Sequence, residues 1–147
     1  GQEVLVAKEK DGWTALMLAS LNGHLEIVEH LVEKGGRELL MAKEEDGWTA
    51  LMLASQNGHL EVVEHLVEQG GQEVLVAKEK DGWTALMLAS LNGHLEIVEH
   101  LVEKGGRELL MAKEEDGWTA LMLASQNGHL EVVEHLVEQG GQEVLVA

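Results

Sequence analysis

Apolar side chains recur at helical spacing along this chain, in blocks that are separated by glycine-containing turns. One block predicts a helix from about His24 or Leu25 to about Lys34, because its apolar positions lie three or four residues apart. The apolar stripe of this helix consists of Leu25, Val28, Leu31 and Val32. Glutamates occupy positions outside the stripe, so we expect the helix to bury one face and to present carboxylates to water.

A shorter apolar block precedes this helix and predicts a second helix over residues 15–21. Thr14 is expected to cap it, since a threonine hydroxyl accepts a hydrogen bond from the free amides of a first helical turn. Asp11-Gly12 and Asn22-Gly23 indicate turns on either side, because glycine accepts a positive φ. The expected core contacts of the short helix are Leu16, Leu18 and Ala19.

Gly35 and Gly36 are predicted to end the long helix, with Gly35 as the left-handed cap. The connector that follows has two versions. Residues 37–43 (RELLMAK) favour helix, whereas their counterparts 72–78 (QEVLVAK) favour strand. Because both versions occupy equivalent places, one preference is overridden, and we expect a helical turn that leads into an extended arm.

The whole pattern repeats along the chain. Residues 1–77 are identical to residues 71–147, and within each copy a looser repeat gives a period of 35 residues with two alternating versions. Such a period predicts a solenoid, in which each unit packs only on its neighbours. We expect a single array over residues 1–147, with units at approximately 1–35, 36–70, 71–105 and 106–140 and a partial unit at 141–147.

Two consequences follow from the repeat. Neither helix of a unit is long enough to be stable alone, so the interfaces between units are expected to hold the fold. Natural repeats accumulate substitutions, whereas these copies carry none, which indicates an engineered or recently duplicated sequence.

Composition narrows the classes of function. The chain has 10 basic and 27 acidic residues, a net charge of −17, which disfavours nucleic acid and anionic membrane surfaces as partners. Trp is the only aromatic residue, and Pro and Cys are absent, which favours helices and excludes disulfide and thiolate chemistry. No targeting signal or membrane-spanning run is visible, so the sequence assigns no compartment. If the chain is expressed in a cell, we expect it in the cytoplasm.

The blocks Thr14–Ala19 (TALMLA) and Asn22–Val28 (NGHLEIV) resemble the ankyrin repeat, whose pattern is TPLHxA followed by NGHLE, then Ile or Val, then Val. The same blocks recur within residues 49–63, 84–98 and 119–133. The resemblance implies an all-α solenoid of helical hairpins, here with four 35-residue repeats. It also implies protein binding as the activity, with no cofactor and no catalysis.

This sequence departs from the family pattern at three places. Ala15 and its equivalents replace the proline, and Met17 and its equivalents replace the histidine that links neighbouring units in the family. Apolar packing is therefore expected to replace that polar link. The connector is two residues longer than the common spacing, which departs from the finger-like hairpin of the family.

The resemblance further implies which positions contact a partner: the hairpin tip, the residue before the capping threonine, and the end of the short helix. In this sequence these are Lys10, Glu45, Lys80 and Glu115; Trp13, Trp48, Trp83 and Trp118; and Leu21, Gln56, Leu91 and Gln126. The four tryptophans form a ladder along one edge, either as a binding stripe or as packing on the next unit's turn. We favour packing.

Two other sets of residues invite a chemical interpretation. His24 and its equivalents are expected to be structural and to cap the turn between helices, whereas His30 has glutamates four residues before and three after it. Without cysteines or a second shell, that spacing favours a solvated helix face over a metal site. Ser20, His24 and Asp11 recur in every unit without a reason to converge, so we predict no catalytic triad.

The first and last units match the interior ones, so neither end carries a polar capping unit. Two apolar faces are therefore expected to be exposed, which favours association. Residues 141–147 duplicate residues 1–7, so the tail acts either as a lid or as one of two segments that compete for one place. Our leading hypothesis is an engineered scaffold that self-associates and is no enzyme. The alternative is a protein-binding module that uses the tryptophan edge.

Overall fold

The computed structural model describes residues 1–147 as nine helices without a strand. In chain order they are α1 (Gln2–Val6), α2 (Ala15–Leu21), α3 (Leu25–Met41), α4 (Ala50–Gln56), α5 (Leu60–Val76), α6 (Ala85–Leu91), α7 (Leu95–Met111), α8 (Ala120–Gln126) and α9 (Leu130–Val146).

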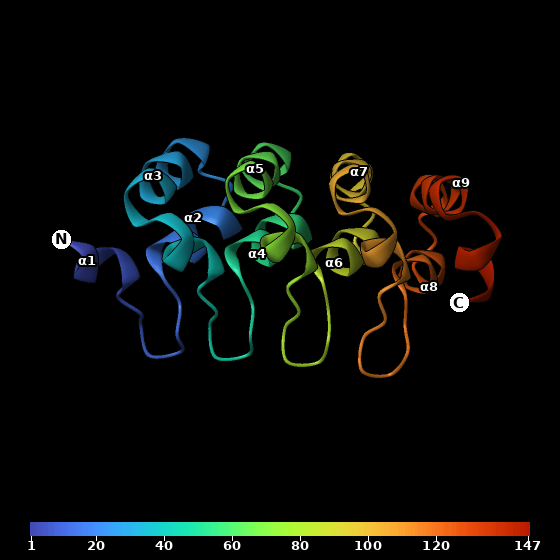
Figure 1. Cartoon of the computed structure of the whole chain (residues 1–147), viewed down its shortest axis with the longest axis horizontal. Helices are drawn as coiled ribbons and strands as arrows, with labels where there is room; N and C mark the ends of the chain where they lie inside the picture. Colours follow the sequence, from blue (N-terminus) through green and yellow to red (C-terminus); the bar gives the residue numbers. More distant parts are fainter.

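The helices form two parallel rows (Figure 1). Each short helix packs beside the next short helix and against the long helix that follows it, and each long helix packs beside the next long one. Loops project from the short-helix row like fingers, and the termini lie at opposite ends of the stack (Figure 1). The predicted all-α helical-hairpin solenoid is confirmed.

The short helices begin where their caps predict. The Oγ1 atom of Thr14 accepts a hydrogen bond from the amide of Met17 at 3.2 Å, and the Sδ atom of Met17 lies 3.4 Å from the amide of Thr14. Thr49, Thr84 and Thr119 accept the equivalent bond. Met17 therefore packs in the buried core and also takes part in the cap of its helix.

Apolar contact between units forms one continuous core. Leu53, Leu88 and Leu123 are buried, whereas Leu18, their equivalent in the first helix pair, is exposed. The prediction that Leu18 lies in the core is wrong because no preceding helix pair covers it. Position in the stack therefore decides burial where the local sequence is the same.

The long helices bend at a glycine one residue later than predicted. Gly36 has φ 60° and ψ −152°, a conformation that is essentially restricted to glycine, whereas Gly35 is helical and buried. A Cβ on Gly35 would lie 2.6 Å from the Cδ2 atom of Leu39. Gly35 is therefore needed for this close approach, and the prediction that it is the left-handed cap is wrong.

The connector after the bend has the expected form. Residues 37–41 make a helical turn, and Ala42 is extended with φ −59° and ψ 142°. Residues 72–76 are helical too, despite their preference for strand, because this places Val74 and Leu75 in the core. Tertiary packing overrides the local preference.

The fingers are closed by a glutamate carboxylate. The Oε1 atom of Glu44 accepts hydrogen bonds from the amides of Asp46 at 2.6 Å and Trp48 at 2.9 Å, and the backbone amide of Glu44 donates to the carbonyl of Trp48 at 3.0 Å. The helical turn at residues 37–41 takes up the lengthened connector. The departure from the family spacing therefore leaves the finger intact.

Histidines link neighbouring units. Three histidines each donate from Nε2, at 2.9 Å, to the last carbonyl of the short helix in the preceding unit: His59 to Leu21, His94 to Gln56 and His129 to Leu91. His24 and its equivalents make no side-chain cap on their own long helix, so the predicted cap is found instead between units, at the short-helix ends that His59, His94 and His129 contact. The polar link between units persists through this residue, although the methionines replace the family histidine.

We expect Gly71→Ala to lower the free energy of unfolding by about 1–3 kcal/mol. Gly71 has φ 66° and ψ −152°, and no atom lies within 4 Å of a Cβ built there, so backbone strain rather than a clash sets the cost. Urea denaturation followed by circular dichroism measures this change. Gln69→Ala, in the exposed helical region just before the bend, is the matched control and should stay within about 0.5 kcal/mol of the parent chain. Equal midpoints for the two variants would contradict the strain.

Candidate functional site

The structure brings five of the predicted site residues together in one groove of about 360 Å³. Its lining combines Trp48, Gln56, Lys80, Trp83 and Leu91 with Asp46, Glu79, Asp81 and Leu88. The groove lies between two consecutive units, in the angle where fingers and short helices meet. The lining is mixed, with four hydrophobic and four charged side chains and one glutamine.

The tryptophans of this groove do two things. Trp48 and Trp83 are half-buried and pack on the core, as the packing alternative expects. Each also leaves part of its ring at the surface, and both line the groove. The backbone amide of each donates to the glutamate that closes its finger, which holds the backbone of each tryptophan at the base of the finger.

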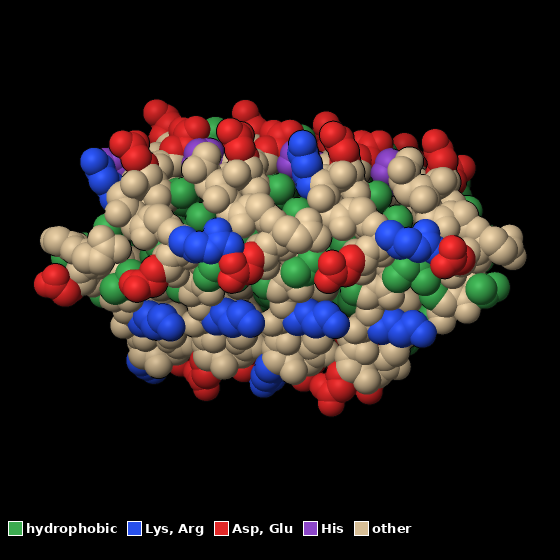
Figure 2. Space-filling view, in the orientation of Figure 1, with side chains coloured by type: hydrophobic (Ala, Val, Ile, Leu, Met, Phe, Trp, Pro, Cys, Tyr) green, Lys and Arg blue, Asp and Glu red, His purple; other side chains and the backbone are tan.

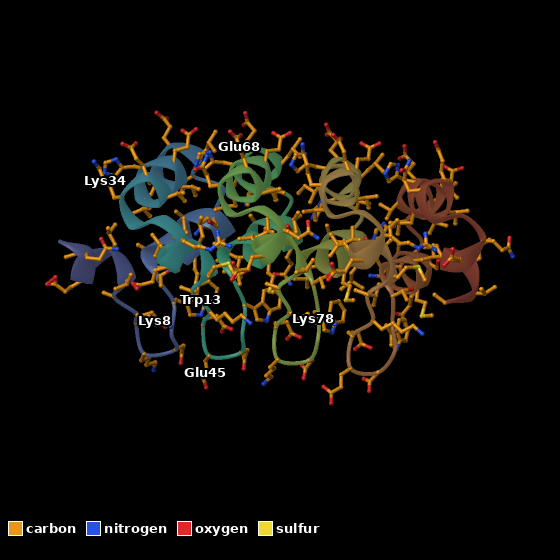
Figure 3. The ribbon with its side chains drawn as sticks, in the orientation of Figure 1. Lys8, Trp13, Lys34, Glu45, Glu68 and Lys78 are labelled. Atoms are coloured by element: carbon orange, nitrogen blue, oxygen red, sulfur yellow. The ribbon has the colours of Figure 1, made fainter.

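The other predicted site residues lie outside this groove. Glu45 is exposed at the tip of its finger, and Trp13 lies where the first finger meets α2 (Figure 3). The half-buried residues are Trp13, Trp118 and Leu21, and the exposed ones are Lys10, Glu45, Glu115 and Gln126. Two of the four predicted tryptophans, Trp48 and Trp83, therefore share this groove, and the ladder along one edge stays a prediction.

An ion pair borders the groove. The Nζ atom of Lys80 lies 3.0 Å from Oδ1 of Asp46, and this hydrogen bond with its opposite charge raises the pKa of Lys80 above its ordinary value of 10.5. Both side chains are more than half exposed, so the pair contributes little to stability. Its role is to set the charge pattern at the groove's edge.

The next fingertip contact has the opposite character. There Glu115 stands in the place of Lys80 and faces Asp81, and a hydrogen bond with Asp81, together with its negative charge, raises the pKa of Glu115 above 4.5. This contact favours the fold at low pH and is lost as the pH rises past the raised pKa. The central fingertip contact therefore joins opposite charges, and the one after it joins two carboxyl groups.

Sequence analysis missed a row of lysines. The Nζ atom of Lys8 donates to the carbonyl of Lys43, and that of Lys43 to the carbonyl of Lys78, both at 3.1 Å. On the face that Figure 2 shows, lysine and arginine side chains form a row along the stack, whereas carboxylates dominate the outer side of the long helices. The signal was present as a lysine at every thirty-fifth position. A second set of cations is paired: Arg37 with Glu73, and Arg107 with Glu143.

The residues that invited a chemical interpretation stay apart. The hydroxyls of Ser20, Ser55 and Ser90 are buried without a hydrogen-bond partner, so no histidine contacts them. His30 is exposed on α3, and no three His, Asp or Glu side chains converge in the geometry of a metal site. No helix combines the length and apolar character that crossing a bilayer requires.

Comparison with known families agrees with this architecture. The family model described as ankyrin repeats (3 copies) matches residues 2–77 and again residues 71–146. No curated protein matches the sequence. The two matches overlap and cover nearly the whole chain, which also has the capped short helices, the long helices and the fingers derived above. The chain belongs to the ankyrin repeat family.

Proposed function

We propose that this chain is a structural scaffold without catalytic activity that associates head to tail through its two end faces. Ankyrin repeats indicate a repeat scaffold or a protein-interaction module. The observation that carries the finer proposal is that identical residues are exposed at the ends and buried inside. The letter-perfect duplication supports an engineered, idealised building block.

The face at the N-terminal end is apolar and is covered only in part, by α1 on α3. Ile27 is 51% exposed, whereas Ile97, its equivalent in the identical stretch, is 2% exposed. Leu18 and Leu88 differ in the same way. Residues 15–41 and 85–111 have the same sequence, so the only difference is the helix pair that precedes the second stretch. A cover of that kind is what the first stretch lacks.

The face at the C-terminal end also exposes apolar side chains that are covered in the interior. Met122 is 38% exposed and Met52 1% exposed, although residues 120–146 repeat residues 50–76. Leu130 is also exposed. Here the missing cover is the helix pair that follows α5 in the interior, which consists of α6 and α7.

The exposed faces at the two ends are complementary to one another. In the interior, α4 and α5 pack on α6 and α7. A second copy that placed its α2 and α3 against α8 and α9 would repeat that interface residue by residue, including a Lys10–Asp116 pair in the place of Lys80–Asp46. Because the two faces differ, copies would join into open chains or closed rings. The net charge of −17 opposes joining, so salt should strengthen it.

We expect Ile27→Glu and Leu130→Glu chains to be monomeric separately and to form a 1:1 dimer, and nothing larger, when mixed. Ile27→Glu places a charge at a position that is buried in the interior, where Ile97 is 2% exposed, and Leu130→Glu places one at a position that is half-buried there, that of Leu60. Each variant keeps the face that the other has lost, so each alone should associate roughly 10-fold to 100-fold more weakly, equivalent to about 1.4–2.7 kcal/mol. Both positions are exposed in the single chain, so both variants should fold. Sedimentation velocity over a concentration series measures the species.

The control for this experiment is Gln69→Glu, which adds the same charge on the exposed side of an interior helix and should associate as the parent chain does. A parent chain that stays monomeric at high micromolar concentration contradicts the proposal. So does extended assembly of either face variant by itself.

A second candidate function is protein binding at the groove between Trp48 and Trp83. Its support is the groove itself, with two indole rings, a glutamine and an ion pair at its edge. Tryptophan is enriched among interface residues that carry most of the binding energy. The partner would be a peptide or protein that presents an apolar side chain to the rings.

We expect peptides selected from a random library on the parent chain to lose about 2 kcal/mol of affinity, roughly 30-fold, on Trp83→Ala. Trp118→Ala is the matched control, because Trp118 is also half-buried but does not line the groove. It should leave affinity within about threefold. Isothermal titration calorimetry measures both variants, after thermal melting has checked that each is folded. Equal losses on the two variants would end this candidate.

A further inference from the structure

We propose that the surface covered by α1 is a docking site for residues Gln142–Val146 of a second copy, which enter it by displacing α1. This inference rests on the proposed head-to-tail association and names what happens at the joint. It starts from the pentapeptide QEVLV, which occurs at residues 2–6, 72–76 and 142–146.

The interior pentapeptide shows the complete set of contacts. Val74 and Leu75 are each 2% exposed, and Val76 packs on the core. Residues 72–76 form the last turn of α5 and lie where the unit of α5 meets the unit of α7. Each boundary between two units holds one segment of this kind. Both neighbouring units are needed to bury it.

The two terminal copies each keep a different half of these contacts. In α1, Val4 is 75% exposed, whereas Leu5 and Val6 are half-buried because α1 packs on α3. In the C-terminal copy the pattern is reversed: Val144 is buried and packs directly against Gly140, whereas Leu145 is 54% exposed. The first copy lacks the preceding unit, and the last copy lacks the following one.

Joining two chains head to tail therefore brings two pentapeptides to a junction that holds one. They cannot both stay, because α1 of one copy and residues 142–146 of the other have the same sequence and the same place. Whichever stays gains the contacts that it lacks as a terminal segment, and the other is released into solvent.

Of the two competing segments, α1 is the one that is displaced from the joint. None of its residues is buried, no side chain caps its N-terminus, and Glu3 has no ion-pair partner. The C-terminal segment is held by buried Val144 and by the pair between Glu143 and Arg107. Terminal segments with few buried contacts open most often. When two copies meet, α1 is therefore the segment that leaves α3, and the C-terminal segment is already in its interior conformation.

The test uses two matched substitutions, Val4→Glu and Leu145→Glu. Both side chains are exposed in the single chain, and the interior equivalent of each is 2% exposed, so each variant should fold and each would be buried only in a joint that retains its segment. Sedimentation equilibrium of the full-length parent and of each variant gives the dissociation constants. Leu145→Glu should weaken association by roughly tenfold or more, and Val4→Glu should leave it unchanged.

A third variant, which lacks residues 1–6, should associate roughly tenfold more tightly than the parent chain, since nothing then has to leave the site. Weakening by Val4→Glu but not by Leu145→Glu would mean that α1 stays, and equal effects of both would mean that no exchange occurs. Either result overturns the inference while association itself stands. If neither the parent chain nor the shortened chain associates, the proposed function fails, and the exchange fails with it.

Discussion

Sideways apolar contact between adjacent helix pairs is the interaction on which this structure depends. A seven-residue helix such as α2 is too short to persist in water, and its apolar side cannot be covered within its own unit. Ile27 and Ile97 make the point within one molecule, because the same side chain in the same sequence is open at the end of the stack and enclosed inside it. Capping threonines fix the start of each short helix and histidines link neighbouring units, but the enclosed area provides the stabilisation.

The regular parts of this fold could be predicted because they depend on local physics. The bounds of the short helix, its threonine cap and the helical turn after Gly36 follow from propensity, capping and periodicity. The position of the bend could not be derived in this way. Gly35 and Gly36 are adjacent identical residues, so local sequence does not distinguish them; in the structure Gly36 takes the positive φ and Leu39 approaches Gly35 closely.

The site was predictable to a similar degree. The family pattern supplied positions such as Trp48 and Lys80, and the fold placed five of them in one groove. The sequence could not show that Asp46 reaches Lys80, because these two side chains lie on different fingers. Nor could it show that the histidine after each Asn-Gly turn bonds a carbonyl of the preceding unit, since that contact spans 38 residues. Contacts across a unit boundary require the superhelical geometry of the stack.

The glutamate at the base of each finger has a consequence for how the chain tolerates variation. Since the carboxylate of Glu44 or Glu79 fastens two amides within its own loop, the finger's shape does not depend on the residue at its tip. The molecule already contains this exchange, with lysine at position 80 and glutamate at 115 on loops of the same conformation. The residue at a fingertip can therefore be substituted without a change in the loop backbone. Such a substitution changes the charge at the tip, and with it the residues on the next finger that the tip can pair with.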